Sequence, residues 1–147
     1  MELLRLTNED FVALVPLHIA YKEAIGEDAP SSSDLCALKN AIEDGRILFF
    51  GCRENDRLVG CCSVSITFST FCYASSGVFE DFYILPAYRH RGIARALVRF
   101  AYENSGVASM TVGCAGCDLP MYKSLGFSIP IGNLLAYEHD IQRNYTV

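Results

Sequence analysis

Apolar positions along the chain recur with two periods, which predicts a mixture of strands and helices. The two-residue period of a strand is found over 2–6, 46–52, 58–68, 77–85 and 107–114. Apolar residues at helical spacing predict four helices. The first starts at a cap in 7–10 and runs to about 24, and the others are expected at 34–43, 91–104 and 116–125. The segment 67–77 is expected to be a connection, and two last strands are expected at 127–130 and 134–140.

The stretch 77–100 organises this pattern, because it reads as a strand, a basic turn and a helix. The strand has apolar residues for both faces: Val78, Phe82 and Ile84 for one, and Phe79, Tyr83 and Leu85 for the other. Such a strand is expected at the centre of a sheet covered on both sides. Strict alternation places Glu80 and Asp81 on opposite faces.

The turn after this strand has the features of an anion site. The first N–H groups of a helix have no internal partner, and the helix dipole adds positive charge there. Gly92 allows close approach of the backbone, Ala94 is nearly as small, and Arg89 and Arg91 add charge. These features favour a phosphate-binding turn.

Two motifs resemble the GCN5-related N-acetyltransferase (GNAT) family. Residues 89–94, Arg-His-Arg-Gly-Ile-Ala, resemble the family's Arg/Gln-x-x-Gly-x-Gly/Ala turn, and residues 122–127 resemble its Tyr-x-x-x-Gly-Phe segment. The resemblance implies one α/β (α+β) domain over 1–147, with a mixed, mostly antiparallel sheet of six to seven strands and helices on both faces. It also implies acetyl-coenzyme A as co-substrate.

The resemblance assigns residues to the coenzyme. The turn residues expected to hold its pyrophosphate are Arg89, His90, Arg91, Gly92, Ile93 and Ala94. The residues expected to bind the pantetheine arm and the thioester carbonyl through their backbone are Phe82, Tyr83 and Ile84. One departure is Ala115, which stands where many members carry an asparagine that contacts coenzyme A.

Acetyl transfer to an amine needs a group that accepts the amine's proton and a group that donates to the departing thiolate. Glu80 is the first choice as base or amine anchor, because a carboxylate in a central strand is expected to have a raised pKa. Asp81 is the reserve base and the expected acceptor-binding residue. The alternative is that one of the two faces a sheet edge or pairs with an arginine. Tyr122 stands where the family places the tyrosine that protonates the thiolate, although a core tyrosine would also fit.

Composition limits the classes of partner. A net charge of −5 argues against a general nucleic-acid binder, and it suits a cationic substrate as well as simple solubility. No apolar run approaches the ~20 residues of a membrane span, and the first residues lack a secretory signal, so a cytoplasmic protein is expected.

Seven cysteines scattered through apolar stretches are expected to be buried small side chains rather than a disulfide framework. Cys114 and Cys117 have redox or metal spacing, but no second pair accompanies them, and no metal site is predicted. A covalent route through cysteine is not expected, because none stands at the turn or beside an evident base.

The predicted function is therefore direct acetyl transfer from acetyl-coenzyme A to a primary amine in a ternary complex. Two alternatives stay open: a catalytically silent acyl-coenzyme A sensor of the same fold, and a thiol-redox protein built on Cys114 and Cys117. The acceptor stays open among a polyamine, an antibiotic, an amino acid and a peptide terminus. A homodimer is the family-level expectation.

Overall fold

The computed structural model describes residues 1–138, and these residues form two compact units. The first unit is Met1–Gly113, and the second begins at Cys114. Within residues 1–138 no helix combines the length and the apolar character that crossing a membrane requires.

The first unit contains the sheet. Its elements are β1 (Glu2–Leu6), the 3-10 turn η1 (Asn8–Asp10), α1 (Phe11–Ala24), α2 (Ser32–Glu43), β2 (Ile47–Glu54), β3 (Arg57–Ser69), β4 (Ala74–Ile84), the 3-10 turn η2 (Pro86–Tyr88), α3 (Ile93–Asn104) and β5 (Ser109–Val112). The second unit contains the 3-10 turn η3 (Gly116–Asp118) and α4 (Leu119–Ser124).

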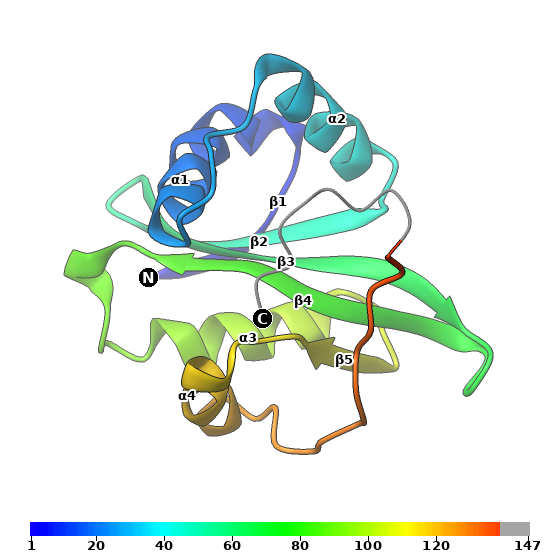
Figure 1. The fold of residues 1–147 in the computed structure, drawn as a ribbon. Helices are drawn as coiled ribbons and strands as arrows, with labels where there is room; N and C mark the ends of the chain where they lie inside the picture. The colour runs from blue at the N-terminus through cyan, green and yellow to red at the C-terminus, as the bar shows by residue number, and fades with distance from the viewer. Residues whose placement is uncertain (139–147) are drawn as a thin grey trace. The chain divides into compact units, whose positions relative to one another are not determined.

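The five strands form one mixed sheet in the order β1-β2-β3-β4-β5 (Figure 1). The pairs β1–β2, β2–β3 and β3–β4 are antiparallel, and the pair β4–β5 is parallel. In the first unit α1 and α2 cover one face and α3 covers the other. The predicted mixed α/β fold is confirmed, whereas the predicted count of six to seven strands is slightly too high.

Three predicted segments differ from the structure. The expected connection at 67–77 is a hairpin instead: β3 continues to Ser69, which pairs with Ala74 at the start of β4. Backbone N–H and C=O groups can complete a ladder there although Phe68 is exposed rather than packed in a core. The expected strand at 127–130 and the described part of the one at 134–140 form no strand, and 139–140 lie outside the described residues. The described part of the second unit contains no strand with which either could pair.

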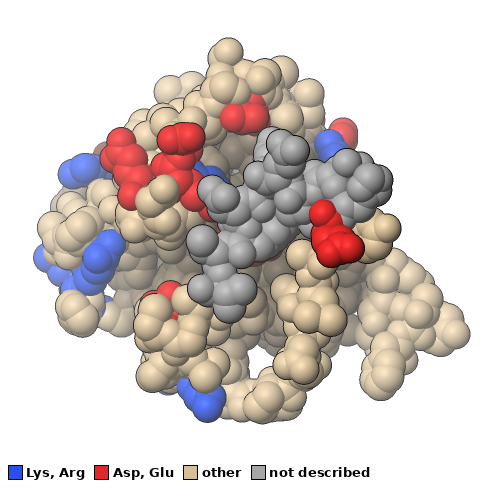
Figure 2. Space-filling view, viewed as in Figure 1, with Lys and Arg blue, Asp and Glu red and all other residues tan. Residues whose placement is uncertain are grey.

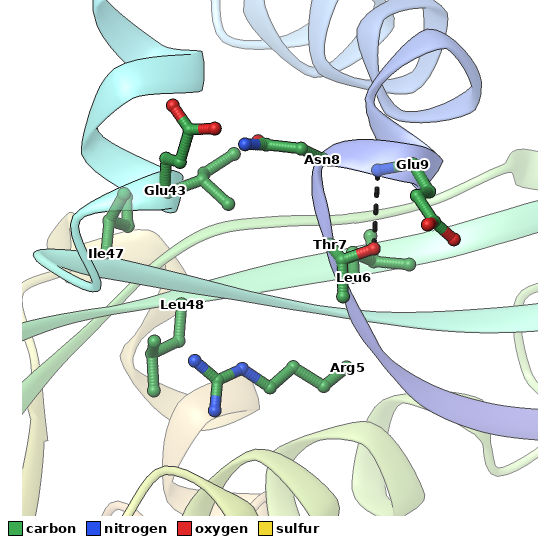
Figure 3. Close-up of a pocket in the computed structure, with 9 residues that line it drawn as sticks. Arg5, Leu6, Thr7, Asn8, Glu9, Glu43, Ile47 and Leu48 are labelled. Atoms are coloured by element: carbon green, nitrogen blue, oxygen red, sulfur yellow. Dashed lines mark hydrogen bonds between the residues drawn. The ribbon is translucent and has the colours of Figure 1, made fainter.

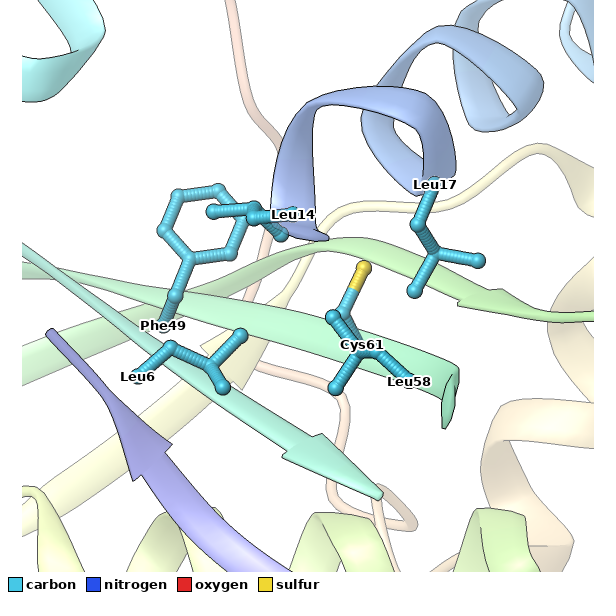
Figure 4. Packing of buried hydrophobic residues seen from close by; sticks show 6 residues of the cluster. All are labelled: Leu6, Leu14, Leu17, Phe49, Leu58 and Cys61. Carbon is cyan, nitrogen blue, oxygen red and sulfur yellow. The ribbon is translucent and has the colours of Figure 1, made fainter. Parts of the chain in front are cut away.

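The core under α1 fixes this helix on the sheet. Leu14 and Leu17 pack against Phe49 of β2 and Cys61 of β3 (Figure 4). Fully burying each of these apolar side chains stabilises the fold by about 1.5–3 kcal/mol. The helical spacing therefore places α1 over β2 and β3, beside the centre of the sheet.

Gly77 is expected to be a sensitive position in β4. A Cβ there would stand 2.5 Å from Val64 Cγ1 and 3.1 Å from Val107 Cγ1. We expect Gly77→Ala to lower the free energy of unfolding by about 1–3 kcal/mol, because the core must shift to admit the methyl group. Urea denaturation measures this loss.

Gly113→Ala is the matched control, because no heavy atom lies within 4 Å of its added Cβ. It should change the free energy of unfolding by no more than about 0.5 kcal/mol. Equal stability of both variants and the native protein would show that β4 is not packed as described.

Candidate active site

A β-bulge interrupts β4 at the two carboxylates. Cys61 pairs with Tyr83, but two residues further along β3 the partner is Glu80, so β4 carries one extra residue. Asp81 in the bulge has a φ of 51°, in the left-handed region where aspartate is tolerated better than most residues. The bulge changes which side chains share a face.

Alternation along the strand is broken as a result. The rings of Phe79 and Phe82 lie 5.4 Å apart, so these residues share a face, contrary to the sequence prediction. Glu80 is directly opposite Ser63, and Ser63 Oγ donates a hydrogen bond of 2.6 Å to Asp81 Oδ2. Both carboxylates therefore lie on the face of Ser63, and the prediction of opposite faces was wrong.

The pKa of Glu80 is raised from its ordinary value, although the residue as a whole is exposed. Partial desolvation of the carboxyl group is the largest cause, and the negative charge of Asp81 adds to it, while Lys22 of α1 opposes it. A carboxylate with a raised pKa is a stronger base than an ordinary one. Glu80 thus has the electrostatic property that the sequence analysis expected of it.

The edge of β4 opens at the same place. Pairing of β4 with β5 begins at Ser76 and ends where Phe79 faces Val112. Beyond that point, no strand of the described chain pairs with the β5 side of Phe82, Tyr83 and Ile84. Backbone N–H and C=O groups on this edge are thus directed away from the sheet.

The turn before α3 presents N–H groups in the way the sequence predicted. Gly92 is the N-cap of α3, has a φ of 83° and makes no side-chain capping bond, and His90 also has a positive φ of 61°. The first backbone bond of the helix is from Ala96 N to Gly92 O. The N–H groups of the first three helical residues, 93–95, precede that bond and form the open helix start.

The two turn arginines make contacts within the protein. Arg89 Nε donates to Ile84 O at 2.8 Å, and its guanidinium lies 5.4 Å from the centre of the Tyr83 ring. Arg91 pairs with Glu54 at 3.3 Å and lies 5.1 Å from the Tyr88 ring. Arg89 therefore ties the turn to the end of β4, which joins the open edge to the helix start.

Tyr122 belongs to the second unit. It lies on α4, which ends before Gly126, and the φ of 110° at Gly126 is the left-handed backbone of a C-terminal glycine cap. Its ring meets that of Phe127 edge-on at 6.0 Å. Burial, and then the charges of Asp118 and Cys114, raise the pKa of Tyr122 to about 12. The phenol therefore keeps its proton near neutral pH.

The sequence analysis missed two buried polar residues on the Asp81 face. Ser63 is fully buried, and His18 of α1 is 7% exposed. The His18 ring stacks on Tyr21, which meets Tyr83 edge-on at 6.5 Å. Two features of the sequence could have indicated this arrangement. One is a histidine among the apolar positions of a helix, and the other is a pair of adjacent carboxylates within a strand, which a regular strand would place on opposite faces.

The cysteines divide into two groups. The three buried ones are as expected: Cys52, Cys61 and Cys62. The expectation is wrong for the four exposed ones, which are Cys36, Cys72, Cys114 and Cys117. Burial raises the pKa of the Cys61 thiol, whose Sγ lies 3.7 Å from Asp81 O, and the charge of Asp81 adds to the shift. In residues 1–138 no group of three or more His, Cys, Asp or Glu residues is arranged to hold a metal ion.

A pocket of about 610 Å³ lies elsewhere in the first unit (Figure 3). It is formed by the end of β1, η1, the end of α2 and the start of β2, and Leu6 and Ile47 are among the residues that line it. None of the predicted site residues lines it. The candidate site is therefore the open edge of β4 rather than this pocket.

Charge is unevenly distributed over the first unit. Figure 2 shows Lys and Arg side chains at the left, where Figure 1 places the turn after β4, and Asp and Glu side chains over α1. Glu23, Glu27 and Asp28, at the end of α1 and after it, are exposed. An anion is favoured at the turn and a cation near α1.

Comparison with known proteins agrees with this geometry. A family model described as an acetyltransferase (GNAT) domain matches residues 45–129, which include β4, the turn and α4. No curated protein matches the chain. The chain belongs to the GNAT acetyltransferase family.

Solved structures share the fold. A probable acetyltransferase is 21% identical, with a TM-score of 0.79 over 94% of this chain and 99% of the other. A predicted acetyltransferase from Clostridium acetobutylicum, solved with acetyl-CoA, is 18% identical, with a TM-score of 0.72 over 92% and 95%. An aminoglycoside acetyltransferase from an uncultured soil metagenomic sample, in complex with sisomicin, is 14% identical, with a TM-score of 0.80 over 92% and 93%. At these identities the likeness concerns the fold.

Proposed function

We propose that this acyltransferase uses acetyl-coenzyme A to acetylate a primary amine directly, in a ternary complex. The observation that carries the proposal is the edge of β4, which loses its β5 partner immediately before the two carboxylates. The basic helix start follows within the family-matched region. A relative of the same fold was solved with acetyl-CoA, which supports the choice of donor.

The residues fit the coenzyme. The helix start at Gly92 offers N–H groups and positive charge for the pyrophosphate, with Arg89 and Arg91 beside it. The open backbone edge at Phe82 and Ile84 would bind the pantetheine amides as a neighbouring strand would. When bound, the coenzyme supplies an activated acetyl thioester.

Glu80 and Tyr122 would do the protein's part of the chemistry. Glu80 takes the proton from the acceptor's ammonium group, directly or through water, so that the amine gains the lone pair with which it attacks. The amine nitrogen would then bond to the acetyl carbon as the carbon–sulfur bond breaks, and the second proton that this nitrogen loses would pass to solvent. Tyr122 would donate its phenolic hydrogen to the leaving sulfur and regain a proton from solvent.

Direct attack is favoured over a cysteine relay. Cys61 is the cysteine on the face of the carboxylates, but it is fully buried, and burial raises the pKa of its thiol. A protonated, buried thiol is a poor nucleophile. The acceptor would therefore meet the acetyl group itself.

The acceptor is expected to be a cation. Both carboxylates lie on the face that α1 covers, and exposed acids follow at the end of that helix. A protein of the same fold was solved with the aminoglycoside sisomicin, which makes it a useful first amine. The experiment is a thiol-release assay with acetyl-coenzyme A and sisomicin, spermidine or a peptide with N-terminal alanine.

We expect at least one of these amines to raise the rate of thiol release well above the amine-free rate. Mass spectrometry should show one acetyl group added to that amine. Coenzyme binding without amine-dependent release across the panel would contradict transfer to amines of these classes and favour the silent sensor.

A further inference from the structure

A row of side chains crosses the sheet beneath α1 and ends at the bulge. Phe49 of β2 pairs with Ser63 of β3, which in turn pairs with Glu80 of β4. Directly opposed residues share a face, so these side chains lie on the side that α1 covers. Ser63 also holds Asp81 by the 2.6 Å hydrogen bond to Oδ2. The row thus connects the core under α1 with the Asp81 carboxylate.

His18 of α1 packs on this row. Its ring meets that of Phe49 edge-on at 6.2 Å and stacks on that of Tyr21, also at 6.2 Å. Its Nδ1 is buried and has no hydrogen-bond partner among the described residues. Leaving such a group unsatisfied costs about 1–3 kcal/mol, and an apolar side chain would fill the same place without that cost. Packing alone therefore does not account for a histidine here.

Charged groups on several elements act on His18. The pKa of the imidazole is lowered from its ordinary value, and desolvation by burial is the largest cause. The negative charge of Asp81 of β4 raises this pKa, the positive charge of Lys22 of α1 lowers it, and the negative charge of Glu27 after α1 raises it. Lys22 is already paired with Glu27 at 2.9 Å. Glu80 lies on the same face, and the thiol of Cys61 stays neutral. The imidazole is thus neutral near pH 7, and Asp81 is the strongest charge favouring its protonation.

We propose that His18 is a positioning residue of the acceptor site. Its neutral imidazole leaves Asp81 free to bind the acceptor's ammonium group, whereas its protonated imidazolium pairs with Asp81 in place of that group. The proposal rests on the proposed function, since it concerns the amine acceptor. Ser63 occupies Oδ2, so the two cations compete for the rest of one carboxylate. The proton that charges His18 comes from solvent, and no covalent bond changes.

A kinetic signature follows from this competition. The apparent KM for the amine equals its intrinsic value divided by the fraction of protein with neutral His18. It should rise about tenfold for each pH unit below the titration midpoint of His18. The KM for acetyl-coenzyme A should not follow the same curve.

The first test needs no acceptor. Histidine imidazole signals are followed by NMR as a function of pH, and the His18 signal is assigned by its loss in His18→Asn. We expect the midpoint of His18 to fall in Asp81→Asn, because the charge that favours the imidazolium is removed. Asp44→Asn, which removes an exposed carboxylate at the end of α2, should leave it unchanged. An unchanged midpoint in Asp81→Asn would overturn the proposal.

The second test uses the native protein and methylammonium chloride, the simplest primary ammonium salt, against sodium chloride at equal ionic strength. Methylammonium should lower the His18 midpoint in the native protein and leave the Asp81→Asn midpoint unchanged, because both cations would use Asp81. His90, in the exposed turn, serves as an internal control. No effect of methylammonium on the native His18 would overturn the proposal even if Asp81→Asn folds poorly.

The third test separates this proposal from the proposed function. With the panel amine that is acetylated, His18→Asn should keep the native KM at alkaline pH and lose its rise at acid pH, because asparagine cannot be protonated there. An acid rise retained in His18→Asn would contradict the proposal. If no amine is acetylated, the proposed function fails, while the NMR midpoints still decide whether His18 and Asp81 compete as described.

Discussion

Replacing Glu80 by Gln is expected to lower kcat/KM for the amine by about 10²–10⁴-fold, the usual contribution of a general base. The amide is nearly the same size, so the bulge and the Ser63–Asp81 hydrogen bond should remain. Binding of acetyl-coenzyme A should change little, because the proposed contacts of the coenzyme lie in the turn and on the backbone edge. Steady-state kinetics with both substrates measure these effects.

The pH dependence of Glu80→Gln adds a second readout. The carboxylate must be unprotonated to accept a proton, so kcat of the native protein is full above the raised pKa of Glu80 and falls below it. Glu80→Gln should lose this acid limb. Glu103→Gln, which removes the exposed partner of Arg99, is the control and should keep native kinetics. Native activity in Glu80→Gln would exclude Glu80 as the base.

Tyr122→Phe is expected to lower kcat by about 10²–10³-fold, the cost of removing one donor from a developing charge. Phenylalanine keeps the edge-on ring contact with Phe127, so the second unit should stay folded. Because burial raises the pKa of Tyr122 to about 12, the native phenol remains a donor at every pH below that value. The rate should therefore show no alkaline loss from Tyr122 in the usual assay range.

Tyr102→Phe on α3 is the matched control, since its side chain is exposed and lies outside the proposed site. Circular dichroism of both variants checks the fold. An unchanged kcat in Tyr122→Phe would assign the protonation of the thiolate to water or to another residue.

The helices and most strands could be predicted because their periods are local properties of the chain. In α3, Ile93, Leu97 and Val98 recur on one side and are buried, as their spacing indicated. The turn at Gly92 was also predictable, since glycine at a positive φ is a local requirement. The matching of two motifs to a family supplied the rest of the fold.

The arrangement of the site could not be predicted in the same way. The alternation rule fails wherever one strand gains a residue, and the register with β3 that creates the bulge at Asp81 depends on residues far away in the sequence. The proposed role of His18 depends on which side chains of the sheet lie under α1, and the helical pattern does not show them. The expected strand at 127–130 is not formed, which shows that an apolar pattern alone does not establish a strand.

We expect the turn at Gly92 to bind acetyl-coenzyme A. Calorimetric titration of the native protein should give a dissociation constant between about 1 μM and 1 mM, the range typical of enzyme substrates. Gly92→Glu places a carboxylate at the helix start and should weaken binding at least about tenfold, because it repels the pyrophosphate. Combining it with Arg89→Glu should weaken binding further.

Gly106→Glu controls for strain in the backbone. Gly106 has a φ of 72° against 83° at Gly92, and neither glycine has a heavy atom within 4 Å of an added Cβ. Native-like binding by Gly106→Glu, together with weak binding by Gly92→Glu, is the result that the account predicts. No binding by the native protein, or equal binding by all three, would contradict it.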